Sequence, residues 1–176
     1  MTALVFVDSS VLLYRRDPTE PVKRPLATTW LEHLWRERTG RTSCQVLSEY
    51  YANATRKLNP PVSADLAWDD VEALQSWRPQ PIDADLLRKG REIERRYRLN
   101  WWDSLIVASA LSQNCALLLS EDLQDGGRFD GVTVRSPFTL SINEAAAEYI
   151  ASPRPTRHPP RGRPRKYPVT RSLEGP

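Results

Sequence analysis

Short apolar runs along the chain predict its strands. The clearest runs are ALVFVD, CALLLS and GVTVRS, each of strand length and rich in β-branched or large apolar residues. TSCQ and RPQPID predict two weaker strands. In chain order, the predicted strands cover residues 3–8, 42–45, 78–83, 115–120 and 131–136.

Longer segments between these runs have helical periodicity. In QVLSEYYANATRKL the apolar residues Leu47, Tyr51, Ala54 and Leu58 fall on one stripe, as in an amphipathic helix. The predicted helices cover residues 9–16, about 23–38, 45–58, 63–76, 83–98 and 102–113, with a short final helix before residue 150. Strands that alternate with helices favour an α/β fold, with a mostly parallel sheet covered on both faces.

Length and charge divide the chain of 176 residues into two parts. We expect one domain over 1–150 and a Pro/Arg-rich tail over 151–176, disordered because it lacks periodic apolar positions. The formal net charge is +3, but the tail carries seven Lys or Arg residues against one acid. The domain is therefore mildly acidic, and the basic tail suits a polyanion.

The apolar residues and cysteines also bear on location. The N-terminal run ALVFV is too short for a signal sequence or a membrane span, and no later run reaches spanning length. Cys44 and Cys115 have no zinc-type spacing and are expected to be small core residues in a reducing compartment. We therefore expect a soluble cytoplasmic protein without a membrane partner.

Four acidic residues are predicted to meet at one edge of the sheet. Asp8 ends the first strand, Glu49 lies one turn into a helix, Asp103 opens an apolar helix and Asp122 follows the strand CALLLS. In right-handed βαβ units, strands end and the next helices begin at the same carboxyl edge. Singly, each acid has an ordinary explanation as a helix cap, turn former or solvated residue. Together they would repel one another unless a cation lay among them, and oxygen ligands alone suit Mg²⁺ or Mn²⁺.

The segments around these acids resemble the PIN domain family, in particular the VapC-type toxin nucleases of prokaryotic toxin–antitoxin pairs. They are VFVDSSVLLY, SEYY, WWDSLIVASA and LLLSEDLQDG, in this order, and the likeness covers residues 1 to about 140. The resemblance implies a three-layer α/β/α sandwich, a metal-dependent endoribonuclease acting on RNA, an antitoxin partner and a homodimer.

On this resemblance, Asp8, Glu49, Asp103 and Asp122 correspond to the family's acidic metal-binding quartet. We expect Asp8 and Asp103 to bind Mg²⁺ or Mn²⁺ directly, Asp122 to bind it directly or through water, and Glu49 to orient water or hold a second ion. Glu121 and Asp125 flank Asp122, and either could share or take its role. Ser10 and Ser120 could add hydroxyl contacts, although nearby backbone groups are the simpler partners.

The tail contains a second resemblance. PRGRPRK, residues 160–166, is similar to the AT-hook, which implies contacts from Arg161, Gly162, Arg163 and Pro164 to the minor groove of AT-rich DNA. A disordered basic tail that binds RNA or any polyanion without sequence preference is the alternative. For the whole protein, the main alternative is a non-catalytic DNA-binding protein that acts through this tail. A phospho-acceptor receiver domain fits less well, because VFVDSS has one acid where that domain has a pair.

Two other features bear on nucleic acid. Helix 83–98 carries six Lys or Arg residues, which could follow a phosphate backbone or form a solvated face. Trp101 and Trp102 fit a core or a dimer seam better than a platform for stacking bases.

Overall fold

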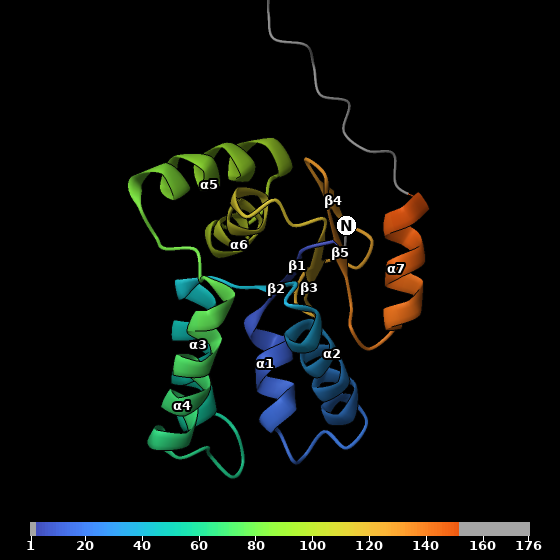
Figure 1. The fold of residues 1–176 in the computed structure, drawn as a ribbon. Coiled ribbons are helices and arrows are strands. Elements are labelled where there is room, and N and C mark those ends of the chain that lie inside the picture. Colours follow the sequence, from blue (N-terminus) through green and yellow to red (C-terminus); the bar gives the residue numbers. More distant parts are fainter. Residues whose placement is uncertain (1–2, 152–176) are drawn as a thin grey trace, which may run out of the picture.

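A five-stranded sheet lies at the centre of the structure, a computed structural model that describes residues 3–151 (Figure 1). Its strands follow the order β2-β1-β3-β5-β4, and only the β4–β5 pair is antiparallel. The strands are β1 (Val5–Val7), β2 (Gly40–Arg41), β3 (Leu117–Leu119), β4 (Arg128–Phe129) and β5 (Val132–Arg135). The predicted α/β class with a mostly parallel sheet is confirmed.

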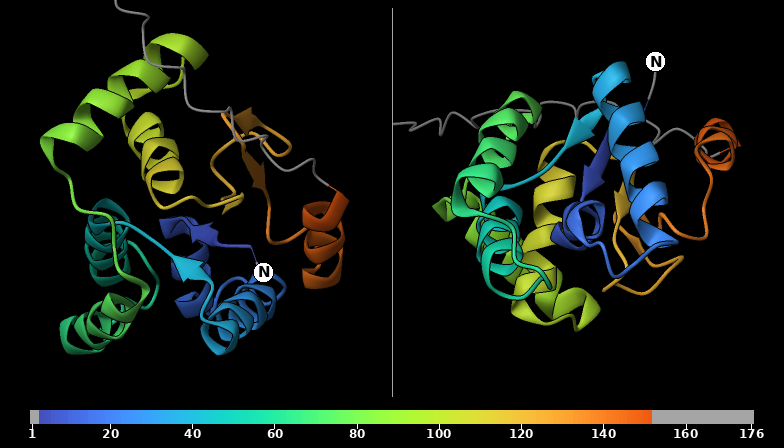
Figure 2. Two further views of the ribbon diagram at one scale, coloured as in Figure 1. Left: turned by 45° about the horizontal axis from the view of Figure 1, so that its top comes forward. Right: turned by 90° about the horizontal axis from the view of Figure 1, so that it is seen from below.

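Helices cover both faces of this sheet. Figure 2 shows α5 and α6 on one side and α1 and α2 on the other, which gives three α/β/α layers. The helices are α1 (Ser9–Arg16), α2 (Lys23–Glu37), α3 (Cys44–Arg56), α4 (Ala64–Leu74), α5 (Ala84–Tyr97), α6 (Trp101–Ser112) and α7 (Ile142–Ala151), with a 3₁₀ turn η1 (Gln75–Trp77) after α4. β1 is buried along its whole length because both of its faces are covered.

The register of the two central strands brings their carboxyl ends together. Val5 pairs with Leu117 and Val7 with Leu119, so both strands end at the same level. The Asp8 amide continues the ladder by donating to the Leu119 carbonyl at 3.0 Å. The residue after β1 therefore lies beside the residue after β3, which is the arrangement that the candidate site requires.

The core extends from β1 to the segment after β5. Phe6, Tyr50, Leu105 and Leu118 are among its largest buried side chains. The Trp30 indole N–H donates to two carbonyls of the 137–140 segment, at 3.1 and 3.2 Å, which holds that segment against α2. Of the apolar stripe predicted on 45–58, Leu47 and Ala54 lie in the core, Tyr51 and Leu58 are partly buried, and Tyr50 is fully buried instead.

Two predicted strands are wrong: one lies at different residues, and the other is not a strand. The strand expected at 42–45 lies at Gly40–Arg41, because Ser43 caps α3 by accepting from the Val46 amide and the helix begins at Cys44. The segment 78–83 makes a single parallel bridge, Ser43 to Gln80, instead of a strand. Prolines on both sides of Gln80 lack the N–H groups that a longer ladder needs.

Strand β4 and the exposure of Cys44 were not predicted. β4 pairs with β5 through a two-residue turn, Asp130–Gly131, in which both residues have positive φ, the geometry favoured for tight hairpins. The Asp-Gly pair before VTV was the sequence feature that could have revealed it. Cys44 is exposed at the first turn of α3, so the expectation that it belongs to the core is wrong, whereas Cys115 is buried as expected.

The tail predictions lie outside the described residues. These include the proposed contacts of Arg161, Gly162, Arg163 and Pro164, and the division of the chain near residue 150 stays a prediction. Within the part that the structure describes, no helix is long and apolar enough to cross a bilayer.

Candidate active site

Asp8 is fixed at the junction of β1, α1 and β3. It is the N-cap of α1, and its Oδ1 accepts from the Ser9 amide at 2.7 Å. Its Oδ2 accepts from the Ser120 hydroxyl, also at 2.7 Å. Because each carboxylate oxygen has a donor and the side chain is only 6% exposed, its position is closely determined.

Glu49 projects from α3 toward the same junction. Its Oε2 accepts from the Ser9 hydroxyl at 3.1 Å, and its Oε1 accepts from Gln45 Nε2 at 2.9 Å. Gln45 lies one turn earlier on α3 and also donates to the Trp102 carbonyl at 3.3 Å. Glu49 is thereby connected to the start of α1 and, through Gln45, to the start of α6.

Asp103 lies in the first turn of α6 but is not its cap, one of the roles that the sequence left open. Asn100 is the N-cap: its Oδ1 accepts from the Asp103 amide at 2.9 Å, and its Nδ2 donates to Asp103 Oδ2 at 2.6 Å. Asp122 follows β3, where its amide donates to the Ser120 hydroxyl at 3.1 Å. Ser120 therefore links the positions of Asp8 and Asp122.

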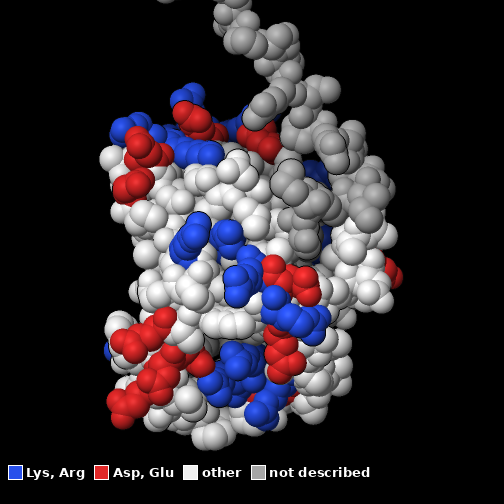
Figure 3. Space-filling model, viewed as in Figure 1, with Lys and Arg blue, Asp and Glu red and all other residues white. Residues whose placement is uncertain are grey.

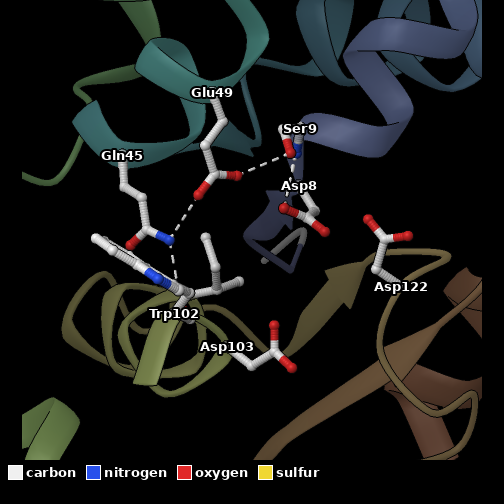
Figure 4. A pocket seen from close by; sticks show the side chains of 8 residues that line it. Asp8, Ser9, Gln45, Glu49, Trp102, Asp103 and Asp122 are labelled. Atoms are coloured by element: carbon white, nitrogen blue, oxygen red, sulfur yellow. Dashed lines mark hydrogen bonds between the residues drawn. The ribbon is translucent and has the colours of Figure 1, made fainter. Parts of the chain in front are cut away.

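The four predicted acids line one cavity of about 200 Å³. Figure 4 shows their side chains arranged around a shared space, with Glu49 above it, Asp103 below it and Asp122 to one side. Ser9, Gln45, Trp102 and Ile106 complete the lining. Ser9, Gln45 and Ile106 were not predicted as site residues, although Ser9 directly follows Asp8 and Gln45 precedes Glu49 by one helical turn.

Burial raises the pKa of Asp8 to about 6. Repulsion by Asp122 and Glu49 acts in the same direction. Hydrogen bonds from Ser120 and from the Ser9 amide oppose the rise, because they stabilise the ionised carboxylate. The buried negative charge is therefore costly even with two donors in place.

Burial and repulsion also raise the pKa values of two other acids of the cavity. Burial raises the pKa of Asp103, as do the charges of Asp122 and Glu49, against a hydrogen bond from Asn100. Burial also raises the pKa of Asp122, with repulsion by Glu121 and Glu49 adding to it. The cavity thus holds more negative charge than its protein donors stabilise.

The acids on either side of Asp122 point elsewhere. Glu121 pairs with Lys23 at 2.5 Å, which lowers the pKa of Glu121 despite its partial burial. Asp125 accepts from Arg135 at 3.2 Å and from the Ser136 amide at 2.9 Å. Of these three acids only Asp122 lines the cavity.

The donor set fits a hard divalent cation. All four acids offer carboxylate oxygens, which suit Mg²⁺ or Mn²⁺, and no His or Cys lines the cavity. A cation would also oppose the repulsion that raises the pKa values of these acids. Among residues 3–151, however, no three His, Cys, Asp or Glu side chains already have their ligand atoms gathered around one point. Side-chain rotation of the more exposed acids would therefore accompany binding.

The basic residues of α5 lie mostly in ion pairs. Figure 3 shows Lys and Arg side chains interleaved with Asp and Glu over this helix. The pairs that involve it are Arg88–Asp85, Arg91–Glu94 and Arg96–Asp130. This mixture of charges favours the interpretation of α5 as a solvated helix face over its use as a binding surface for a phosphate backbone.

The two tryptophans of α6 differ in their surroundings. Trp101 is partly buried and packs against the core, as expected. Trp102 is 59% exposed at the cavity, so a place in the core is wrong for this residue.

The chain belongs to the PIN domain family, whose model matches residues 5–124. The matched range includes all four acids of the cavity. No curated protein sequence matches the chain.

Similar solved structures share the fold. One is described as FitAB bound to an IR36 DNA fragment: it is 19% identical, with a TM-score of 0.58 over 78% of this chain and 98% of that chain. Another is VapC20 of Mycobacterium tuberculosis, a toxin that cleaves the sarcin-ricin loop: it is 19% identical, with a TM-score of 0.52 over 67% of this chain and 91% of that chain. A third is VapBC2 of Rickettsia felis bound to promoter DNA: it is 14% identical, with a TM-score of 0.55 over 76% and 98% of the two chains.

Proposed function

We propose that the protein is a Mg²⁺- or Mn²⁺-dependent endoribonuclease that hydrolyses RNA phosphodiester bonds. The observation that carries this proposal is the convergence of Asp8, Glu49, Asp103 and Asp122 on one cavity in a PIN fold. Three of these acids have raised pKa values, so the metal-free site carries unbalanced charge. Function is best argued from such a site, because one fold can serve many activities.

The side chains of the cavity would divide the work. Asp8, Asp103 and Asp122 would hold the ion, and Ser120 keeps Asp8 and the start of the 121–125 loop in place. The ion, when bound, would supply polarisation of water and neutralisation of charge at the phosphodiester. Glu49 would accept a hydrogen bond from the attacking water, since Ser9 and Gln45 orient its carboxylate.

We further propose that this nuclease is the toxin of a type II toxin–antitoxin pair. The similar structures include FitAB and VapBC2, both described as bound to DNA, and the VapC20 toxin. By analogy, the partners would be a cognate antitoxin and a second copy of the chain in a homodimer. Co-expression with the product of an adjacent small gene, followed by co-purification, tests the antitoxin partner.

The test of the enzyme is cleavage of total RNA by the purified chain with Mg²⁺, with Mn²⁺ and with a chelator. We expect cleavage with either ion and none with the chelator. Asp8→Asn and Asp103→Asn should each lower the cleavage rate by roughly 100-fold or more, because each removes a group essential to the site. Asp69→Asn is the matched control, because Asp69 is exposed on α4 away from the cavity. Undiminished, chelator-resistant cleavage by Asp8→Asn would refute the proposal.

The alternative, a non-catalytic DNA-binding protein, rests on the basic tail and its AT-hook-like segment. Removing 151–176 separates the two proposals. The nuclease would retain metal-dependent cleavage, whereas a protein that acts only through the tail would lose its affinity for nucleic acid. Comparing the affinity of the full chain for AT-rich and GC-rich duplexes at fixed salt tests the AT-hook itself.

A further inference from the structure

Trp102 presents a large aromatic surface at the mouth of the acidic cavity. The residue is 59% exposed, although the residues from Ser104 to Ala110 on α6 are buried. Exposing an indole forgoes a large gain from burial, so this position calls for an explanation. The neighbouring Trp101 shows that this turn of α6 also offers a site packed against the core.

The position of Trp102 is tied to that of the acids. Its carbonyl accepts from Gln45 Nε2, the same nitrogen that donates to Glu49. The next residue is Asp103, and both residues line the cavity; in Figure 4 the indole lies at the edge of the cavity and extends away from the carboxylates of Asp8 and Asp122. A ligand group that stacks on the indole would therefore have a defined position relative to the carboxylates.

The chemistry of the cavity and its edge indicates which kind of ligand would bind there. Carboxylates at the centre repel an anion unless a cation is bound, whereas a flat uncharged ring gains from contact with the indole face. A nucleotide combines the two requirements, since its phosphate suits the cation and its base suits the indole. Bases within a duplex have both faces covered, so the base must be unpaired.

We propose that Trp102 is a substrate-positioning residue that stacks on an unpaired base of RNA beside the scissile phosphodiester. The inference rests on the proposed nuclease function and adds to it a contact between Trp102 and a base beside the scissile bond. Trp102 would act mainly on substrate binding, while the acids perform the chemistry.

The first measurement compares the kinetics of cleavage of a single-stranded oligoribonucleotide. Trp102→Ala should raise KM by roughly 5- to 150-fold, the range seen when a stacked base loses its aromatic partner, with a much smaller change in kcat. Trp102→Phe should restore most of the loss. Trp68→Ala is the matched control, since Trp68 is 52% exposed on α4 and does not line the cavity. An unchanged KM for Trp102→Ala overturns the inference.

The second measurement detects the contact itself. Abasic nucleotides are placed in turn at each position around the cleavage site. An abasic nucleotide at one position should weaken cleavage by the wild type about as much as Trp102→Ala does with the intact substrate. The same abasic substrate should lower cleavage by Trp102→Ala only slightly further. A structural role for Trp102 would give the same added loss at every position, which would exclude stacking.

Two further outcomes are decisive. If light scattering shows that Trp102→Ala converts a dimer to a monomer, the residue belongs to a seam between copies and the inference is overturned. If the wild type cleaves no RNA, the proposed function fails. The stacking inference is then tested by comparing the affinities of the wild type and of Trp102→Ala for the intact oligonucleotide. Equal affinity of wild type and Trp102→Ala, or no binding at all, would refute stacking.

Discussion

Replacing Asp8 by Asn should stabilise the metal-free protein at neutral pH while abolishing cleavage. Asp8 is buried, and its pKa rises from 3.8 to about 6 on folding. A site that serves function at the expense of stability is expected to become more stable when its charge is removed. Asn has the same shape and keeps one oxygen to accept from the Ser9 amide, so the change removes the charge and costs one hydrogen bond, the one that the Ser120 hydroxyl donates.

The magnitude follows from linkage between protonation and folding. Because the folded state binds this proton more tightly than the unfolded state, stability is greatest below the unfolded pKa of 3.8 and falls as the pH rises to about 6. The full difference between the two pKa values corresponds to about 3 kcal/mol. Above pH 6 the wild type carries this whole penalty, and Asp8→Asn carries none of it.

The assay is urea or thermal unfolding with a chelator, at pH values from 4 to 8. Taking the difference between wild type and Asp8→Asn at each pH cancels the titration of other groups. We expect the variant to gain about 1–3 kcal/mol at pH 7.5, or roughly 2–12 °C in Tm, with the gain disappearing toward pH 4. Adding Mg²⁺ should stabilise the wild type and have less effect on the variant, because binding to the folded state adds stability.

Asp69→Asn serves again as the control for loss of one negative charge. It should show no pH-dependent difference from the wild type, because Asp69 is exposed. A variant Asp8→Asn that is no more stable than the wild type at pH 7.5, or whose gain is the same at pH 4, would contradict the reasoning. Such a result would mean that Asp8 ionises without strain and that the cavity has no unbalanced charge.

Three more predictions concern the surroundings of the site. Ser120→Ala should move the acidic limb of the cleavage profile to higher pH, because Asp8 loses a hydrogen bond that lowers its pKa; a profile measured from pH 5 to 8 checks this. Glu121→Gln should keep cleavage within about threefold of wild type and cost at most about 1 kcal/mol in denaturant unfolding, since its partly exposed ion pair lies outside the cavity. Gly40→Ala should lower the free energy of unfolding by about 1–3 kcal/mol, because the added methyl would meet the Trp77 ring at 2.5 Å; urea melts measure it.

Much of the site was predictable because its acids follow recognisable elements. Asp8 ends one apolar run and Asp122 is the second residue after another, and parallel strands bring their carboxyl ends to one edge whatever the details of packing. Glu49 was assigned by its position one turn into the helix that follows the second predicted strand, which lies at the same edge. These are local patterns combined with a rule of chain topology, and they do not depend on the exact shape of the core.

The weak strands were less predictable because their assignment depends on partners distant in sequence. β2 consists of two residues, and its place depends on the cap at Ser43 and on the Trp77 ring that packs where a side chain of Gly40 would lie. The segment 78–83 is extended, as its prolines favour, but Pro79 and Pro81 limit it to one bridge.

The sequence by itself determined the α/β class, the places of the main strands along the chain and the acidic residues that cluster at the carboxyl edge of the sheet. Only the tertiary structure decided which acid after β3 faces the cavity, because Lys23 draws Glu121 away and Arg135 draws Asp125 away. It also decided that Trp102 is exposed beside the acids, whereas Trp101 packs inward. Periodicity follows from backbone geometry and can be found in the chain, but the direction of a particular side chain depends on neighbours that only folding brings together.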